Sequence, residues 1–256
     1  MPSLPIGVPA VLPIDVAEAY TTFANLGVRV EPRPILRVED PDGTVVWEVQ
    51  PERERVLEPE VAYIMVDMMK DVVNAGSGAA VRNPDQGNIP YTLPVAGKTG
   101  TTNDATDVWF AGFTPNLLAV VWLGFDMPQP ILPSAAGGVY AAPVWADFVR
   151  PVYFDEGEAR AGSGTEAEPR IAFPQDWPRP DGLVTAVIDR GTGELFNPDW
   201  CPQDAMREEL YLPGTEPTEL CDVHAPGLFG APLRGLPQDL PDTSAPDSAP
   251  DSTGGG

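Results

Sequence analysis

The spacing of apolar and polar residues predicts three helices in the first 155 residues of the chain. Residues 13–25 and 143–154 have helical spacing, and residues 59–74 form the strongest pattern, with apolar positions recurring every 3.6 residues. The stripe of residues 59–74 consists of Val61, Ile64, Met65, Met68, Met69 and Val72. The matching face of residues 143–154 carries Val144, Trp145, Phe148 and Val149. We interpret the stripe of residues 59–74 as buried in a core, and residues 143–154 as a closing helix.

Strand patterns lie between these helices. Residues 35–38 and 45–49 flank the turn sequence Asp40-Pro41-Asp42-Gly43, which predicts an antiparallel hairpin. Residues 93–96, 108–113 and 117–125 are three consecutive strand patterns with short connections. They predict an antiparallel meander.

The composition changes after residue 155. Of the 256 residues, 32 are Pro and 25 are Gly, more than a fifth of the chain, whereas ordinary usage of the pair is about 12%. We predict a first domain at 1–155, a linker at 156–180, a small cysteine-bearing module at 181–224 and a disordered acidic tail at 225–256. Within the module, residues 183–189 have a strand pattern.

The charge disfavours two classes of partner. A net charge of -23, from 38 acidic and 15 basic residues, repels both nucleic acid and anionic lipid surfaces. No apolar run approaches the ~20 residues of a membrane span. The N-terminal residues are apolar but contain four prolines within residues 1–20 and no basic residue, so they make a poor signal peptide.

Two cysteines, Cys201 and Cys221, lie close together in the module. They would form a disulfide in an oxidising compartment, and a pair of buried thiols is the alternative. A zinc site is disfavoured because His224 is the only histidine and a structural zinc site takes four ligands. We therefore expect no metal and no cofactor.

The sequence Lys98-Thr99-Gly100-Thr101-Thr102 follows a strand pattern and has the chemistry to hold a carboxylate. Lys98 supplies a cation and the threonines supply hydroxyl donors. Gly100 removes a side chain where a substrate would lie against the strand, and the backbone N–H of Thr101 could stabilise an oxyanion. By itself a Lys-Thr-Gly triplet is a weak signal, and a solvated strand end with a turn glycine is then the favoured explanation.

The neighbouring residues make the motif specific. Asp107-Val108-Trp109-Phe110 and Trp122-Leu123-Gly124 follow it in order, and Leu212-Pro213-Gly214-Thr215-Glu216-Pro217-Thr218 lies between the two cysteines. With these segments, residues 2–224 resemble the class A penicillin-binding proteins, the bifunctional peptidoglycan synthases.

The resemblance implies a fold, a reaction and a site. The fold would be α/β, a partial β-lactamase/transpeptidase-like domain with an antiparallel sheet packed by helices. The reaction would be transpeptidation of D-Ala-D-Ala stem peptides in the cell envelope, with peptidoglycan and β-lactams as ligands. Lys98 and Thr101 would take part in catalysis, and Lys98, Thr99, Gly100, Thr101 and Thr102 would bind the substrate. Trp109 and Trp122 are expected in the core.

Two motifs of that family are missing from this chain. Its only lysines, Lys70 and Lys98, follow Asp67 and Val95 by three positions, so no Ser-x-x-Lys exists, and no Ser-x-Asn occurs. We therefore expect a C-terminal fragment that is inactive alone, exposes apolar surface, and has as partner an upstream fragment with the nucleophile. The alternative is a non-catalytic relative that binds cell-wall peptides or proteins, and the module could act independently in such interactions.

Overall fold

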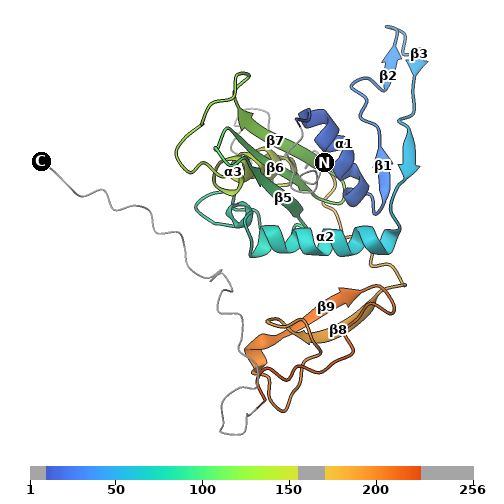
Figure 1. Cartoon of the computed structure of the whole chain (residues 1–256). Coiled ribbons are helices and arrows are strands. Elements are labelled where there is room, and N and C mark those ends of the chain that lie inside the picture. The colour runs from blue at the N-terminus through green and yellow to red at the C-terminus, as the bar shows by residue number, and fades with distance from the viewer. Residues whose placement is uncertain (1–9, 155–170, 226–256) are drawn as a thin grey trace, which may run out of the picture. The chain divides into compact units, whose positions relative to one another are not determined.

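A computed structural model describes residues 10–154 and 171–225, which form two compact units divided between Asp181 and Gly182 (Figure 1). The predicted tail lies outside the described residues from 226 onward, as does the predicted linker up to residue 170. None of the helices in the described ranges is long and apolar enough to cross a lipid bilayer.

The first unit is built around a three-stranded antiparallel sheet, as the sequence predicted. Its strands are β5 (Ala96–Thr101), β6 (Asp107–Phe113) and β7 (Leu118–Gly124), in that spatial order. Lys98 is paired with Ala111 and Gly100 with Trp109. The predicted meander is therefore confirmed, but β5 begins later than expected and includes the Lys-Thr-Gly triplet itself.

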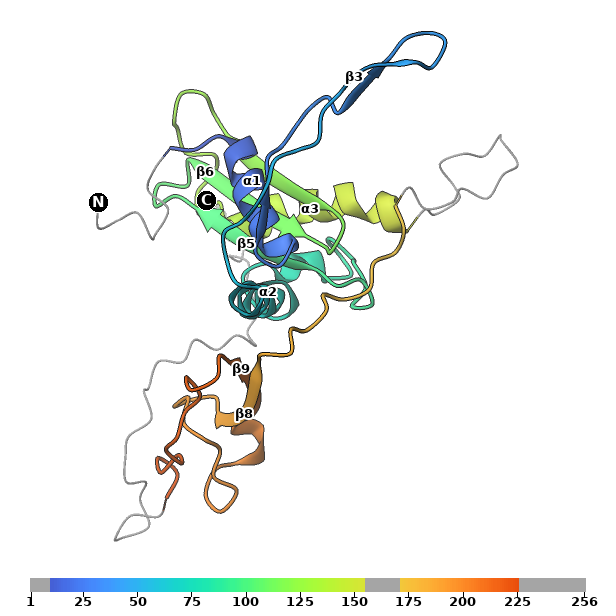
Figure 2. The same ribbon diagram turned by 90° about the vertical axis from the view of Figure 1, so that its right-hand side faces the viewer.

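Three helices pack around this sheet (Figure 2). Helix α1 (Pro13–Ala24) and helix α3 (Gly137–Tyr153) cover opposite faces, and α2 (Pro59–Asn74) runs beside β5. The resulting arrangement is the expected α/β fold.

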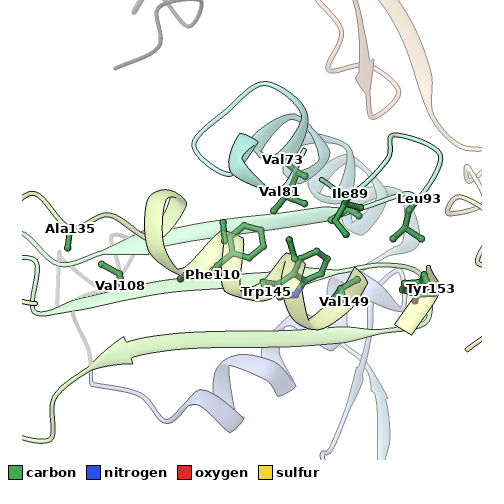
Figure 3. Packing of buried hydrophobic residues seen from close by; sticks show 14 residues of the cluster. Val73, Val81, Ile89, Leu93, Val108, Phe110, Ala135, Trp145, Val149 and Tyr153 are labelled. Atoms are coloured by element: carbon green, nitrogen blue, oxygen red, sulfur yellow. The ribbon is translucent and has the colours of Figure 1, made fainter. Parts of the chain in front are cut away.

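The larger core lies between the sheet and α3 (Figure 3). The rings of Phe110 and Trp145 meet edge to face at 5.6 Å, and the Trp145 indole donates a hydrogen bond to the Gly112 carbonyl at 3.0 Å. Both side chains are fully buried. Because the indole N–H is satisfied, burying Trp145 carries little polar cost.

The buried face of α2 differs from the predicted stripe. Its buried residues are Ala62, Val66, Met69 and Val73, whereas Met68 is 56% exposed. The helix is turned by about one residue, or about 100°, from the predicted orientation. Ala62 is small and allows close packing, but alanine contributes little to a pattern of large apolar residues, so the pattern did not indicate this face.

Helix α3 also differs, since it begins at Gly137 and not at Pro143. Proline favours the first turn of a helix, which is why the sequence placed the start there, yet Pro143 lies inside α3. Trp145 and Val149 are buried, but Val144 and Phe148 are 45% and 55% exposed. With Tyr140 they form an exposed apolar stripe at a spacing of four residues.

Two pairs of short strands accompany the sheet in the first unit. Strands β2 (Arg37–Glu39) and β3 (Val45–Glu48) form the predicted hairpin, which projects away from the sheet in Figure 2. Its turn is held by Asp40, whose Oδ1 accepts the backbone N–H groups of Asp42 and Thr44. Strands β1 (Val28–Val30) and β4 (Arg53–Arg55) also pair, and no sequence pattern predicted this pair.

Part of the predicted linker packs against the first unit. Trp177 is buried, its ring lies 5.6 Å from that of Phe113, and its indole donates to the Ala24 carbonyl at 2.9 Å. Trp177, as an aromatic residue in a Pro-rich stretch, was the one sequence signal that this part of the predicted linker packs against a folded unit.

A buried arginine fixes the approach to β5. After α2 comes a short 3-10 helix, η2 (Ala79–Val81), and the guanidinium of Arg82 then donates to Asn74 and to the carbonyls of Ile89, Pro90 and Leu93. Burial lowers the pKa of Arg82. These bonds order the polar loop that leads into the Lys-Thr-Gly strand.

The second unit is a small β structure. Strand β8 (Val184–Asp189) pairs antiparallel with β9 (Met206–Tyr211), and η3 (Gln203–Ala205) precedes β9. The sequence predicted β8 and missed β9, whose Arg-Glu-Glu centre is polar. The hydrophobic cluster is small and consists of Cys201, Cys221 and Val223, with Phe196 packed against it.

Candidate active site

Strand β5 presents the Lys-Thr-Gly residues on two faces of the sheet. Side chains alternate along a strand, so Lys98 and Gly100 share the face of Ala96, which packs toward α1. Thr99 and Thr101 share the opposite face, on which α3 packs. Lys98 and Thr101 therefore do not meet through their side chains, and a ligand held by both would lie along the strand edge.

Lys98 carries an exposed ammonium group. Its Nζ donates to the Thr99 carbonyl at 3.1 Å, and no carboxylate of the described residues lies within 4.0 Å of it. An exposed cation without an anionic partner can take an incoming carboxylate without first breaking an ion pair.

Thr101 joins the strand to the start of α3. Its Oγ1 accepts the backbone N–H of Gly137 at 3.0 Å, which leaves the hydroxyl hydrogen able to donate. The backbone N–H of Thr102 donates to the Asp107 carbonyl of β6. Because backbone groups alternate in direction along a strand, the N–H of Thr101 points away from β6, toward the outer edge of β5.

Thr99 and Thr102 have partners within the first unit. Thr99 Oγ1 lies 2.6 Å from Ser77 Oγ. Thr102 Oγ1 accepts the N–H groups of Thr106 and Asp107, each at 3.0 Å, and so closes the turn between β5 and β6. Ser77 was not predicted at this site. Its position between Gly76 and Gly78 was the available signal, since paired glycines permit a close backbone approach.

Gly100 lies against an aromatic pair. A Cβ atom at Gly100 would meet Trp109 Cβ at 3.1 Å, so the missing side chain makes room for Trp109. The rings of Trp109 and Trp122 lie 5.9 Å apart, and the Trp122 indole donates to Asp107 at 2.9 Å. Both tryptophans are half-buried and belong to neither core cluster, so the expectation that they lie in the core is wrong.

The second lysine lies away from this strand. Lys70 pairs with Asp176 at 2.7 Å and lies over the ring of Trp177 at 5.4 Å. A hollow of about 370 Å³ opens beside it, lined also by Asn74 and Arg82. Lys70 therefore has a structural partner, in keeping with its lack of a serine three positions before it.

In the second unit both cysteines are free thiols and both are buried. Burial raises the pKa of the Cys201 thiol to about 11, and nearby Cys221 and Asp189 also raise it. The structure brings Asp189, Cys201, Cys221 and His224 together, with one ligand atom from each lying within 4.8 Å of the others. The sequence argument against a metal counted only the cysteines and His224, and it did not consider Asp189, which lies beside them.

Comparison with known families agrees with the fold. Residues 2–150 match the penicillin binding protein transpeptidase domain, and residues 179–226 match the C-terminal domain of penicillin-binding protein 1A. Penicillin-binding protein 1A of Neisseria gonorrhoeae is 39% identical over 156 residues, which cover 58% of this chain and 18% of that protein. The Neisseria lactamica protein of the same name is 37% identical over 199 residues, covering 76% and 22%.

A solved structure shares the fold. Penicillin-binding protein 1A from Haemophilus influenzae superimposes with a TM-score of 0.67 at 22% identity, over 86% of this chain and 35% of that one. The chain spans about a fifth of the length of the two Neisseria relatives. With the transpeptidase model matched over more than half of the residues, the chain belongs to the class A penicillin-binding proteins, within their transpeptidase region.

Proposed function

We propose that this chain provides the part of the active site that binds the substrate carboxylate in a peptidoglycan D,D-transpeptidase of the cell envelope. Lys98 would bind the terminal carboxylate of a D-Ala-D-Ala stem peptide, or that of a β-lactam. The observation that carries the proposal is the exposed Lys98 ammonium on a strand whose outer edge presents the N–H of Thr101. Together they offer a charge for the carboxylate and a donor for a carbonyl oxygen.

The contacts of each threonine indicate its role in the proposed site. Thr101 would add its hydroxyl hydrogen to the ligand while its oxygen stays bonded to Gly137. Thr99 would hold the strand in position through its hydrogen bond to Ser77. Thr102 would hold the end of the strand by closing the turn between β5 and β6. The acyl-forming serine would come from a segment with Ser-x-x-Lys, which this chain lacks.

Peptide titration tests the proposal. The ¹⁵N-labelled chain is titrated with an acylated Lys-D-Ala-D-Ala peptide, and the same peptide with a C-terminal amide is the ligand control. We expect saturable shifts of the Thr101 amide with the carboxylate peptide only, and loss of these shifts in Lys98→Met. Lys70→Met is the matched variant, since it removes the other lysine, and should bind as the parent does. Equal response to both peptides would contradict a carboxylate clamp.

A second candidate function is retention of cell-wall peptides without catalysis. Two observations favour it: among residues 10–154 and 171–225 no carboxylate pairs with Lys98, and the given sequence contains no Ser-x-x-Lys. The two functions separate when a segment of a relative carrying Ser-x-x-Lys is added: a transpeptidase part gains acylation by labelled penicillin, whereas a binding protein does not.

A further inference from the structure

We propose that Asp189, Cys201, Cys221 and His224 form a zinc-binding site in the second unit. Each residue offers one ligand atom, and all four atoms lie within 4.8 Å of one another. The two cysteines and Asp189 are buried, and His224 is half-buried. The cluster belongs entirely to the second unit and is independent of the Lys-Thr-Gly strand.

The types of ligand select the metal. Two thiolates, an imidazole and a carboxylate form a mixed sulfur, nitrogen and oxygen set that suits Zn²⁺ in tetrahedral geometry. With bonds of about 2.0 to 2.3 Å, the ligand atoms of such a site lie about 3.3 to 3.8 Å apart. His224 Nε2 and Asp189 Oδ2 are already 3.1 Å apart. Since no two of the ligand atoms are more than 4.8 Å apart, the remaining pairs need to approach by at most about 1.5 Å, which is within the reach of small side-chain rotations.

Asp189 is oriented for this role by the turn that follows it. Its Oδ1 accepts the backbone N–H groups of Gly191 at 2.9 Å and Thr192 at 3.1 Å. Its Oδ2 faces His224. One oxygen thus holds the turn and the other is directed at the cluster. Burying a carboxylate costs free energy unless positive charge or hydrogen-bond donors surround it, and a bound cation would supply that charge.

Backbone hydrogen bonds hold the two cysteines in place. The N–H of Cys201 donates to the Asn197 carbonyl, and the N–H of Cys221 donates to the Leu195 carbonyl, both at 2.8 Å. Leu195 is bridged to Ile188 at the end of β8, beside Asp189. The turn closed by Ala225 N–H on the Asp222 carbonyl then brings His224 back toward Cys221. Three separate segments of the chain therefore converge, and a metal ion would cross-link them.

The size of the unit supplies a reason for such a cross-link. Among the described residues of the unit, its hydrophobic cluster consists of Cys201, Cys221 and Val223 with Phe196. Small folds with so little core usually need a metal or a disulfide. A disulfide would use the cysteines alone and would leave His224 and Asp189 as a hydrogen-bonded pair at 3.1 Å beside it. Zinc uses all four groups and releases the two thiol protons on binding.

The experiment uses the full chain, purified reduced and without metal. Zinc is added, unbound metal is removed by gel filtration, and bound zinc and free thiols are counted. Co²⁺ in place of zinc reports thiolate bonds through charge-transfer absorption and tetrahedral geometry through its visible bands. We expect one metal per chain, with the spectrum of a tetrahedral thiolate site.

Variants test each ligand class. Cys201→Ser should abolish the charge-transfer intensity of one thiolate, and Asp189→Asn and His224→Gln should each weaken zinc binding at least about 10-fold. Asp199→Asn is the matched control, since Asp199 is an exposed carboxylate in the same loop, and should bind as the parent does.

Three results would overturn the proposal. One is a parent chain, reduced and folded by circular dichroism, that binds no Co²⁺ at micromolar concentration. Another is unchanged zinc affinity in both Asp189→Asn and His224→Gln, compared with Asp199→Asn. That result would show that only the two cysteines bind the metal. The third is a chain isolated from an oxidising compartment with a Cys201–Cys221 disulfide whose reduction does not restore metal binding.

Discussion

Thr101 Oγ1 accepts the backbone N–H of Gly137 across 3.0 Å, which ties the end of the Lys-Thr-Gly strand to the first residue of α3. The N-terminal N–H groups of a helix have no partner within the helix. Gly137 is buried, so water does not readily replace the threonine. The same hydroxyl that is proposed to face a substrate therefore also anchors the helix that packs beneath the sheet.

Removing this acceptor should lower stability. Thr101→Val keeps the shape and loses the oxygen, and we expect a drop of about 1 kcal/mol in the free energy of unfolding. Thr101→Ser retains the oxygen and should stay within about 0.5 kcal/mol of the parent. Urea unfolding of the three proteins measures both changes, and equal stability of the valine and serine variants would show that the bond contributes nothing.

The next position of α3 approaches another backbone segment. A Cβ atom at Gly138 would collide with the carbonyl oxygen of Ser77, the residue whose hydroxyl contacts Thr99. Gly138→Ala should therefore destabilise the first unit by about 1 to 3 kcal/mol. Val139→Ala is the matched control, because Val139 is 55% exposed, and it should change stability by less than about 0.5 kcal/mol. A neutral Gly138→Ala would mean that α3 can move away from Ser77.

Adjacent methionines on α2 distinguish the two possible faces of that helix. Met69 is 5% exposed and belongs to the cluster with Ala96 and Phe113, whereas Met68 is 56% exposed. Met69→Ala should cost about 2 to 5 kcal/mol, and Met68→Ala less than about 0.5 kcal/mol. Thermal or urea unfolding gives both values. Equal costs would favour the stripe predicted from the sequence.

That difference illustrates which features the sequence could predict. The hairpin and the meander depend on turns such as Asp40-Pro41-Asp42-Gly43, whose conformation is set locally. Helix orientation depends on the surfaces that meet the helix, so the α2 pattern predicted its bounds but not its buried face. The β1–β4 pair joins residues that are far apart in the sequence, such as Arg29 and Glu54, which are 25 positions apart, and it has no local signal.

The candidate sites divide in the same way. Lys98 and its strand could be proposed as a site from the sequence because their chemistry lies in consecutive residues. Asp189 was missed because it is 12 residues from Cys201 and resembles an ordinary turn aspartate. Only the folded chain turns its second oxygen toward His224.

The pH dependence of stability should involve Tyr20. Burial raises the pKa of Tyr20 above its ordinary value, which is about 10. The folded protein thus keeps the phenol proton at a pH where the unfolded chain loses it. The stabilisation is fully present below pH ~10 and is lost as the pH rises through the folded-state pKa.

Substitution of the phenol tests this effect. Tyr20→Phe should make the loss of unfolding free energy above pH ~10 less steep, because the ring contacts with Phe23 and Phe113 remain possible. Tyr140→Phe removes a phenol that is 37% exposed and is the matched control. Parallel stability curves for the parent and Tyr20→Phe between pH 8 and about 11 would contradict the prediction.

The chain alone should not form a covalent adduct with penicillin. Acylation requires a serine activated by a nearby lysine, and loss of a serine nucleophile costs on the order of 10⁶ in kcat. Ser77 is the serine placed beside the Lys-Thr-Gly strand, but its hydroxyl is bonded to Thr99 and Lys98 lies on the opposite face of β5. Incubation with a fluorescent penicillin, followed by denaturing electrophoresis and intact-mass measurement, should therefore show no added mass.

A labelled band that persists in Ser77→Ala would point to another nucleophile in the chain, and one that disappears would assign the reaction to Ser77. Either band would refute the prediction, whereas a blank lane beside a labelled relative carrying Ser-x-x-Lys would support it.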